Sequence, residues 1–250
     1  MSIWGKILGG AAGFALGGPL GALLGAVAGH AVDRLADPPV QASAGSEEDD
    51  RAAMRQIAFT IGVIVLGAKM AKADGVVSRS EIAAFKQVFT VPPEEETNVG
   101  RIFDHARVDA QGYEPYARQI ARLFRRKSRV LEGLLDALFH IAKADGQVGE
   151  AEIAYLRGVA QIFGFDDADF ARLRESHLGP AAADPYSILG VTREMDNAAI
   201  KAAYRRIVRD SHPDRLIAKG MPPEAVALGT ARLATVNAAY ERICKERGLA

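Results

Sequence analysis

Helical periodicity dominates the middle of the chain. Apolar residues recur at helical spacing through residues 51–177, and no segment there alternates as a β-strand would. Glycine and proline divide this stretch into candidate helices. The predicted helices span residues 52–73, 79–90, 94–108, 114–126, 129–144, 150–163 and 167–176. Because 49% of the 250 residues are hydrophobic, the chain can bury a sizeable core, so the sequence predicts an all-α protein.

This helical stretch contains an internal repeat. Residues 71–82 and 142–153 are similar at an offset of 71 residues. Each copy ends one helix, turns at Asp-Gly and begins another helix with a glutamate seven residues after the aspartate. Carboxylates brought together in this way are ligands for a hard divalent cation. The candidate metal ligands are Asp74, Glu81, Asp145 and Glu152.

The same glutamates also fit a second role, which is helix capping. Ser78 to Glu81 has the spacing of a capping box, and Gly149 is an acceptable N-cap three residues before Glu152. The repeat lacks the further carboxylates at alternate positions that a full calcium loop supplies. We therefore expect no tightly bound cofactor, with a weak divalent cation as the alternative.

The two repeated halves resemble the TerB fold, a helical domain named for tellurite resistance. The resemblance implies a TerB-like domain over residues 51–178, preceded by a linker over residues 36–50 and followed by a connector over residues 179–183.

A glycine-rich segment precedes the linker. Glycines recur every four residues between Gly5 and Gly29, and no charged residue lies between Lys6 and Asp33. An uncharged run of this length is sufficient to cross a bilayer as a helix. Repeated small residues along one helix face also allow two such helices to approach closely. The segment therefore predicts a transmembrane anchor over residues 1–35, with membrane contact through residues 7–31 and a homodimer through the glycine face.

A second interpretation of this segment stays open. Glycine and alanine insert into a bilayer less favourably than leucine, and Pro19 lies in the middle of the run. The segment is then a helix that lies on the membrane surface or packs against protein.

The C-terminal part of the chain contains two helical patterns on either side of His212-Pro213-Asp214. Apolar residues of the first pattern recur at helical spacing from Ile200 to Val208, and the second pattern runs from about 224 to 245. Pro213 cannot continue the first helix, so the tripeptide is predicted to lie exposed in the loop of a helix hairpin. The basic residues Lys201, Arg205, Arg206 and Arg209 fall outside the apolar stripe and form a basic face.

Four sequence blocks in this region, in this order, resemble those of a J-domain: residues 184–191, 200–205, 212–214 and 237–241. The resemblance implies a J-domain over residues 184–250 that binds a DnaK-type chaperone and stimulates its ATP hydrolysis, without a catalytic group of its own. It assigns partner contacts to His212, Pro213 and Asp214 and to the basic face before them. Asp210 and Ser211 depart from the family pattern, in which a basic and an aromatic residue are common.

The charge distribution fits these assignments. The formal net charge of the chain is zero, which argues against a nucleic-acid partner. Residues 184–250 carry 11 basic and 8 acidic residues, so this segment suits an acidic partner. A further basic cluster, Arg122, Arg125, Arg126, Lys127 and Arg129, is either a solvated helix end or a contact for anionic lipid.

The order of the three parts resembles the DjlA type of membrane-anchored J-proteins of Gram-negative bacteria. That resemblance implies a single-pass protein of the bacterial inner membrane with most of the chain on the cytoplasmic side. The predicted function is a membrane-tethered cochaperone. The alternative is a TerB-type metal or stress sensor, or interaction protein, with an auxiliary J-domain. No arrangement of nucleophile and base indicates an enzyme.

Overall fold

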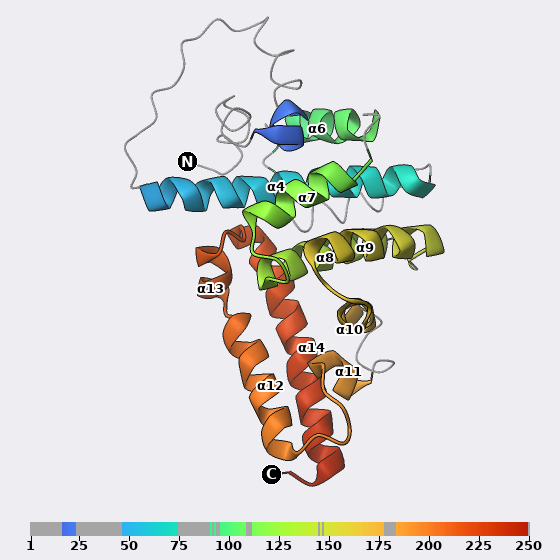
Figure 1. Cartoon of the computed structure of the whole chain (residues 1–250), viewed down its shortest axis with the longest axis vertical. Helices are drawn as coiled ribbons and strands as arrows, with labels where there is room; N and C mark the ends of the chain where they lie inside the picture. The colour runs from blue at the N-terminus through green and yellow to red at the C-terminus, as the bar shows by residue number, and fades with distance from the viewer. Residues whose placement is uncertain are drawn as a thin grey trace, which may run out of the picture.

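The computed structural model describes residues 17–23, 47–74, 91, 93, 96–108, 112–144, 146, 148–177 and 184–249. Within these residues every regular element is a helix, as the sequence predicts. The helices described between Glu47 and His177 form a layered domain, and those between Pro185 and Arg247 extend from its lower side, with the C-terminus at the far end (Figure 1).

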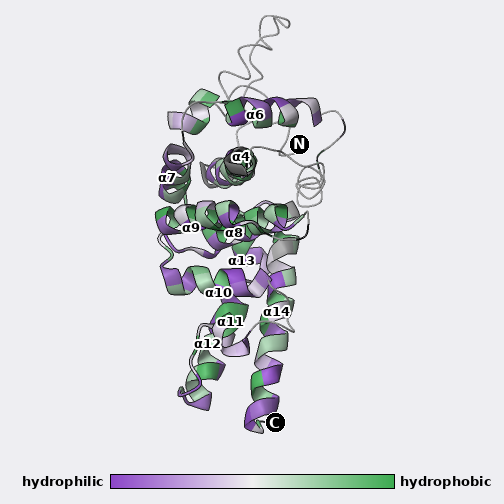
Figure 2. Ribbon diagram, turned by 90° about the vertical axis from the view of Figure 1, so that its right-hand side faces the viewer, coloured by the Kyte–Doolittle hydropathy of each residue, from purple (hydrophilic) through white to green (hydrophobic). Residues whose placement is uncertain are grey.

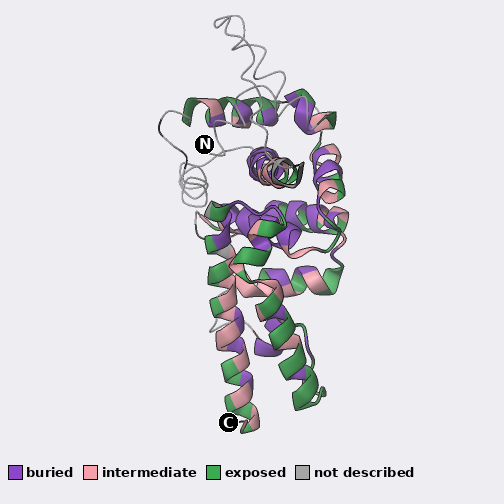
Figure 3. Cartoon of the chain, turned by 90° about the vertical axis from the view of Figure 1, so that its left-hand side faces the viewer, coloured by how far each residue is buried: buried purple, intermediate pink, exposed green. Residues whose placement is uncertain are grey.

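The long helix α4 (Glu47–Asp74) is the centre of the layered domain. It contacts α6 (Glu96–Val108), α7 (Glu114–Leu123), α8 (Arg129–Ala142) and α9 (Glu150–Phe163). All residues from Ile57 to Ala71 are buried, and in Figure 3 the layer of α8 and α9 is buried as well. Gly62 permits close packing, since a Cβ there would lie 2.8 Å from the Ile120 side chain. A glycine of α4 therefore lies where this helix packs closely against α7.

Helix α4 also passes a length and composition test for a membrane span. The segment Arg51–Ala71 is long and apolar enough, but 78% of its apolar window is buried inside the protein. Its apolar residues are thus buried in the core of the layered domain. Hydrophobic residues likewise gather on α8 and α9, which complete this core together with α10 (Asp167–His177) (Figure 2).

The described part of the glycine-rich segment packs against this domain. Residues 18–23 are helical, and Leu20 and Leu23 are buried. Gln119 on α7 donates a hydrogen bond from Nε2 to the Gly17 carbonyl (2.8 Å), and its Oε1 accepts one from the Leu20 amide (2.9 Å). In this structure residues 17–23 therefore agree with the second interpretation, in which the segment packs against protein. The rest of the predicted 7–31 span lies outside the described residues, as does the predicted helix 79–90.

The C-terminal domain is a four-helix arrangement around an antiparallel pair. Its helices are α11 (Pro185–Leu189), α12 (Asn197–Asp210), α13 (Pro213–Ala218) and α14 (Pro223–Arg247). A small separate core lies between α11, α12 and α14 and includes Ile200, Ile207 and Ile243. The Tyr204 and Tyr240 rings stack across α12 and α14 with centroids 4.0 Å apart. Asp196 caps α12 by accepting a hydrogen bond from the Ala199 amide, which fixes where that helix begins.

Several helix boundaries differ from the sequence prediction. Helix α4 begins at Glu47, inside the predicted linker, and not at 52, and α8 ends at Ala142 and not at 144. Helix α7 ends at Leu123 and not at 126, because Phe124 takes an extended conformation and buries its ring in the domain core. Pro213 and Asp214 begin the short helix α13, whereas the sequence predicted that the whole tripeptide lies in a loop. Proline suits the first position of a helix because its missing N–H has no partner there in any case.

Candidate functional site

The His212-Pro213-Asp214 tripeptide lies where the chain passes from α12 into α13. His212 is the N-cap of α13, and its Nδ1 accepts a hydrogen bond from the Asp214 amide (3.3 Å). With Nδ1 as acceptor, the neutral imidazole carries its proton on Nε2. The side chains of His212 and Asp214 are 60% and 88% exposed. The tripeptide is thus held in one backbone conformation while its two polar side chains face solvent.

The predicted basic face of α12 divides into two parts. Lys201, Arg205 and Arg209 are exposed and spaced four residues apart, so they form one stripe along the helix. Arg206 is also exposed, but it lies about 100° further round the helix and lines the cleft between the two domains. The structure therefore brings three of the four predicted basic residues together, and the fourth belongs to a different surface.

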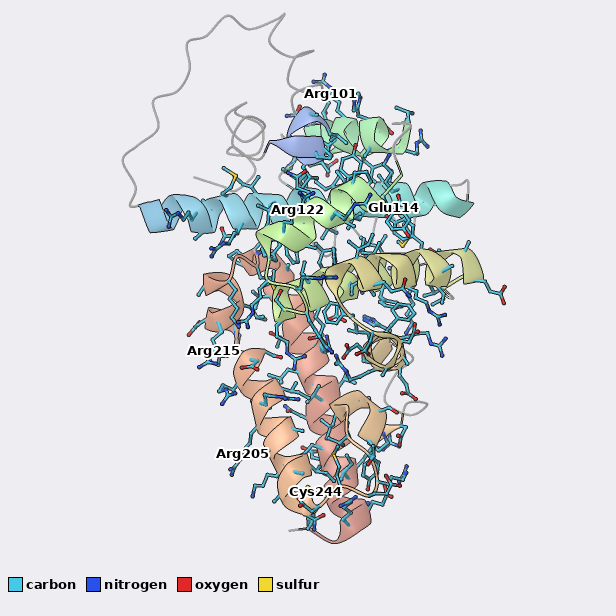
Figure 4. All side chains as sticks on the ribbon, viewed as in Figure 1. Arg101, Glu114, Arg122, Arg205, Arg215 and Cys244 are labelled. Carbon is cyan, nitrogen blue, oxygen red and sulfur yellow. The ribbon has the colours of Figure 1, made fainter. Side chains whose placement is uncertain are left out.

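Arg205 and Arg215 lie on the same outer side of the C-terminal domain (Figure 4). Asp210 links the stripe on α12 to α13, because its carboxylate pairs with Arg209 of the stripe (3.4 Å) and with Arg215 of α13 (3.5 Å). The acidic residue that departs from the J-domain pattern thus orders two neighbouring guanidinium groups. Tripeptide, stripe and Arg215 form one polar surface, which we call the docking face.

Other residues of the C-terminal domain are attached to the layered domain. Leu216, Met221, Ala225 and Val226 belong to the same apolar core as α4 and α8. Gly133 on α8 leaves room for the Met221 methyl, which lies 2.2 Å from where a Cβ would stand. The C-terminal domain is therefore anchored through α13 and the beginning of α14, and α11 contacts α10 in addition.

A buried network of ion pairs accompanies this apolar contact. Arg232 on α14 donates to Asp136 (3.0 Å) and to Glu132 (2.5 Å), both on α8. Glu132 also pairs with Arg129 and, at 2.7 Å, with Arg172 of α10, and Asp136 contacts His177 at 2.9 Å. Both carboxylates are almost completely buried. We call these six residues the interdomain network.

The network keeps its acids ionised. Burial by itself raises the pKa of Glu132, but Arg232, Arg172 and Arg129 outweigh burial and hold that pKa well below its usual range. Asp136 behaves in the same way, since Arg232 and His177 lower its pKa against the effect of burial. The pKa of Arg232 is raised, because the two carboxylates outweigh its own desolvation.

The sequence analysis missed the interdomain network. Arg232 lies 96 residues from Asp136 and 100 residues from Glu132, so no local spacing links them. One signal was present. Glu132 and Asp136 are four residues apart on an otherwise apolar helix, and acids at such positions require cationic partners.

The predicted metal ligands are only partly described. Glu152 caps α9, since its carboxylate accepts a hydrogen bond from the Gly149 amide (2.7 Å), as the capping interpretation requires. Glu81 and Asp145 lie outside the described residues, as does the side chain of Asp74. Among the residues that the structure describes, no three acidic, histidine or cysteine side chains gather as a metal site would require. The cation stays a prediction.

Comparison with known families agrees with this architecture. Residues 184–247 match the DnaJ domain, residues 60–175 match tellurite resistance protein TerB, and residues 1–55 match the transmembrane domain of co-chaperone DjlA. The helix hairpin with its exposed tripeptide thus makes the chain a J-domain protein.

Full-length relatives define the family further. The co-chaperone protein DjlA of Shewanella oneidensis is 33% identical over 274 aligned positions and covers 100% of both chains. DjlA of Vibrio cholerae is 29% identical and also covers 100% of both. DjlA of Coxiella burnetii is 28% identical over 78% of this chain and 80% of its own length. The chain belongs to the DjlA co-chaperone family. No solved structure is significantly similar to it.

Proposed function

We propose that this chain is a membrane-tethered cochaperone whose J-domain binds a DnaK-type chaperone and stimulates its ATP hydrolysis. The observation that carries the proposal is the exposure of His212 and Asp214 on a domain that is fixed to its neighbour through other, buried residues. A partner can reach the tripeptide without displacing any contact between the two domains. The role is regulatory, because the chaperone supplies the chemistry.

The electrostatics of the docking face support an acidic partner. Lys201 and Arg205 are exposed, and neither forms an ion pair within the part of the chain that the structure describes. Among the described residues, Arg209 pairs with Asp210 alone, at 63% and 29% side-chain exposure. An acidic surface can therefore bind along α12 at little desolvation cost.

The test is the single-turnover ATPase rate of the chaperone with the full chain in detergent micelles. Wild type should accelerate the rate, and His212→Gln should abolish the acceleration because it removes an exposed group and leaves the fold intact. Lys245→Gln, an exposed cation at the far end of α14, is the matched surface control and should stimulate as wild type does. Equal stimulation by His212→Gln and wild type would contradict the docking assignment.

We further propose a single-pass inner-membrane anchor within residues 7–31, with the J-domain on the cytoplasmic side and a homodimer through the glycine face. The match of residues 1–55 to a transmembrane domain and the uncharged glycine-rich run support the anchor. Spanning requires that residues 17–23 leave their contact with Gln119. Protease accessibility of tags placed before and after the segment in sealed inner-membrane vesicles tests the topology.

A further inference from the structure

A basic cleft of about 830 Å³ lies between the two domains. One wall is the loop from Phe124 to Ser128 that joins α7 to α8, together with Arg55 of α4. The other wall comes from the J-domain, through Gly190, Arg206 and Lys219. Any ligand in this cleft would therefore contact both domains.

The cleft carries an excess of positive charge. Eight basic side chains and three acidic side chains line it. Each acid already has a cationic partner. Glu132 pairs with arginines of the interdomain network, Asp169 pairs with Lys127 at 2.6 Å, and Asp210 pairs with Arg209 and Arg215. The acids are thus matched by cations that are themselves part of the fold.

Five cations in the cleft remain without an anionic partner among the described residues: Arg55, Arg125, Arg126, Arg206 and Lys219. All five are exposed. They come from both domains and line one cleft, so an anion bound there would be attracted by cations of both domains. Such a site selects a ligand with several negative charges.

We propose that this cleft binds a phosphate-bearing anion, either the headgroup of an anionic phospholipid or a soluble oligophosphate. Four of the five unpaired cations are arginines, whose planar guanidinium binds phosphate oxygens in pairs. The beginning of helix α8 at Ser128 and Arg129 also lines the cleft and adds its positive helix end. The inference is independent of the chaperone-docking proposal.

The sequence analysis considered anionic lipid for the cluster from Arg122 to Arg129. The structure divides that cluster. Arg125, Arg126, Lys127 and Arg129 line the cleft, whereas Arg122 is exposed on α7 outside it (Figure 4). The anion site is therefore a partly open interdomain cleft and not a flat basic surface, which allows binding of a defined headgroup.

The test is isothermal titration calorimetry of the full chain, reconstituted in nanodiscs of neutral lipid, with inorganic tripolyphosphate as the probe. Wild type should bind it. The variant Arg125→Gln with Lys219→Gln removes one cation from each wall and should weaken binding about tenfold or more. Neither residue belongs to the docking face, so ATPase stimulation by this variant should equal that of wild type.

The matched control is Arg101→Gln with Arg174→Gln, which removes the same charge from two exposed positions outside the cleft. This control should bind tripolyphosphate as wild type does. Equal weakening in both double variants would show attraction by overall charge alone and would overturn the proposal. Absence of binding to wild type, or binding of an oligoglutamate peptide in place of tripolyphosphate, would also overturn it.

A second arm separates the two sources of phosphate. The thermal unfolding midpoint is compared in nanodiscs with and without phosphatidylglycerol and with no added phosphate. If the ligand is a lipid headgroup, phosphatidylglycerol should raise the midpoint of wild type and of the control variant but not that of the cleft variant. If the ligand is soluble, all midpoints should be the same in both lipids while tripolyphosphate still binds to the cleft.

Discussion

The two ends of the J-domain are held by different interactions. The inner end, formed by α13 and the first half of α14, shares the apolar core of the TerB-like domain and is joined to it by the buried interdomain network. The outer end is held by exposed polar contacts. Arg193 pairs with Asp184 (2.9 Å) and Glu246 (2.6 Å) at roughly half exposure. A domain fixed at one end can present its remaining surface to a partner.

The difference shows how this J-domain remains ordered with a small core of its own. Nine buried residues form its separate core, and a core of this size contributes little stabilising free energy by itself. The inner end gains further burial from the neighbouring domain. The basic stripe of the docking face lies on α12, which has no extensive contact with that domain, whereas Asp214 and Arg215 of the docking face belong to α13. Partner binding is therefore assigned to exposed residues of α12 and α13, and attachment to the neighbouring domain to buried residues of α13 and α14.

The largest effect should come from breaking the interdomain network at Arg232. Arg232→Met leaves Glu132 and Asp136 buried with less compensating charge, which should cost about 3–5 kcal/mol of unfolding free energy. Urea unfolding measures this loss, and Lys245→Met on the exposed part of the same helix should change the value by no more than about 0.5 kcal/mol. Equal losses of unfolding free energy in the two variants would show that the interdomain network does not stabilise the inner end.

Substitution of one glycine at each end of the J-domain compares the two ends directly. Gly220 at the inner end has φ +98°, and an added Cβ would lie 2.3 Å from Cβ of Arg55. Gly248 at the outer end has φ +63° and open space around it. Gly220→Ala should cost about 2–4 kcal/mol, from backbone strain and overpacking together, whereas Gly248→Ala should cost about 1 kcal/mol. Thermal unfolding of the two variants tests the comparison, and a larger loss for Gly248→Ala would contradict it.

Acid should loosen the inner end. The folded-state pKa values of Glu132 and Asp136 lie below their unfolded values, so both bind fewer protons when folded. Their stabilisation is present above about pH 4.5 and is lost as the pH falls toward the folded pKa values. Unfolding free energy measured from neutral pH to about pH 3 should fall steeply in wild type and less steeply in Glu132→Gln with Asp136→Asn. The same slope in both proteins would contradict this assignment.

The smallest effect should come from the outer ion pairs. Arg193→Ala removes two exposed pairs and should cost up to about 1 kcal/mol, with a smaller loss at high salt. Arg193 also stacks over the Tyr186 ring at 4.3 Å, so part of the loss should persist in salt. Chemical unfolding at low and high ionic strength separates these two contributions.

The sequence predicted the helices well where they are long and periodic. Helices α9 and α12 lie where the apolar spacing placed them, because a buried stripe fixes both period and phase. The six residues of α13 are too few to show a period, so the tripeptide was assigned to a loop.

The candidate site was predictable only as far as local motifs reach. His212 and Asp214 were expected to be exposed, and they are. The partner contact of Arg206 stays a prediction, and only the packing of the two domains shows that this residue lines the cleft. The pairing of Arg232 with Asp136 and Glu132 depends on tertiary contacts across about a hundred residues, which no periodicity encodes.

The central claim is that the inner end of the J-domain is part of the folded TerB-like domain while the docking face is free. Amide hydrogen exchange of the full chain in detergent micelles tests it most directly. The account predicts that amides of residues 225–236 on α14 exchange as slowly as those of α8, and that amides at the exposed turn around His212 exchange fast. Fast exchange throughout residues 225–236 while α8 remains protected would contradict it, because the J-domain would then move independently of its neighbour.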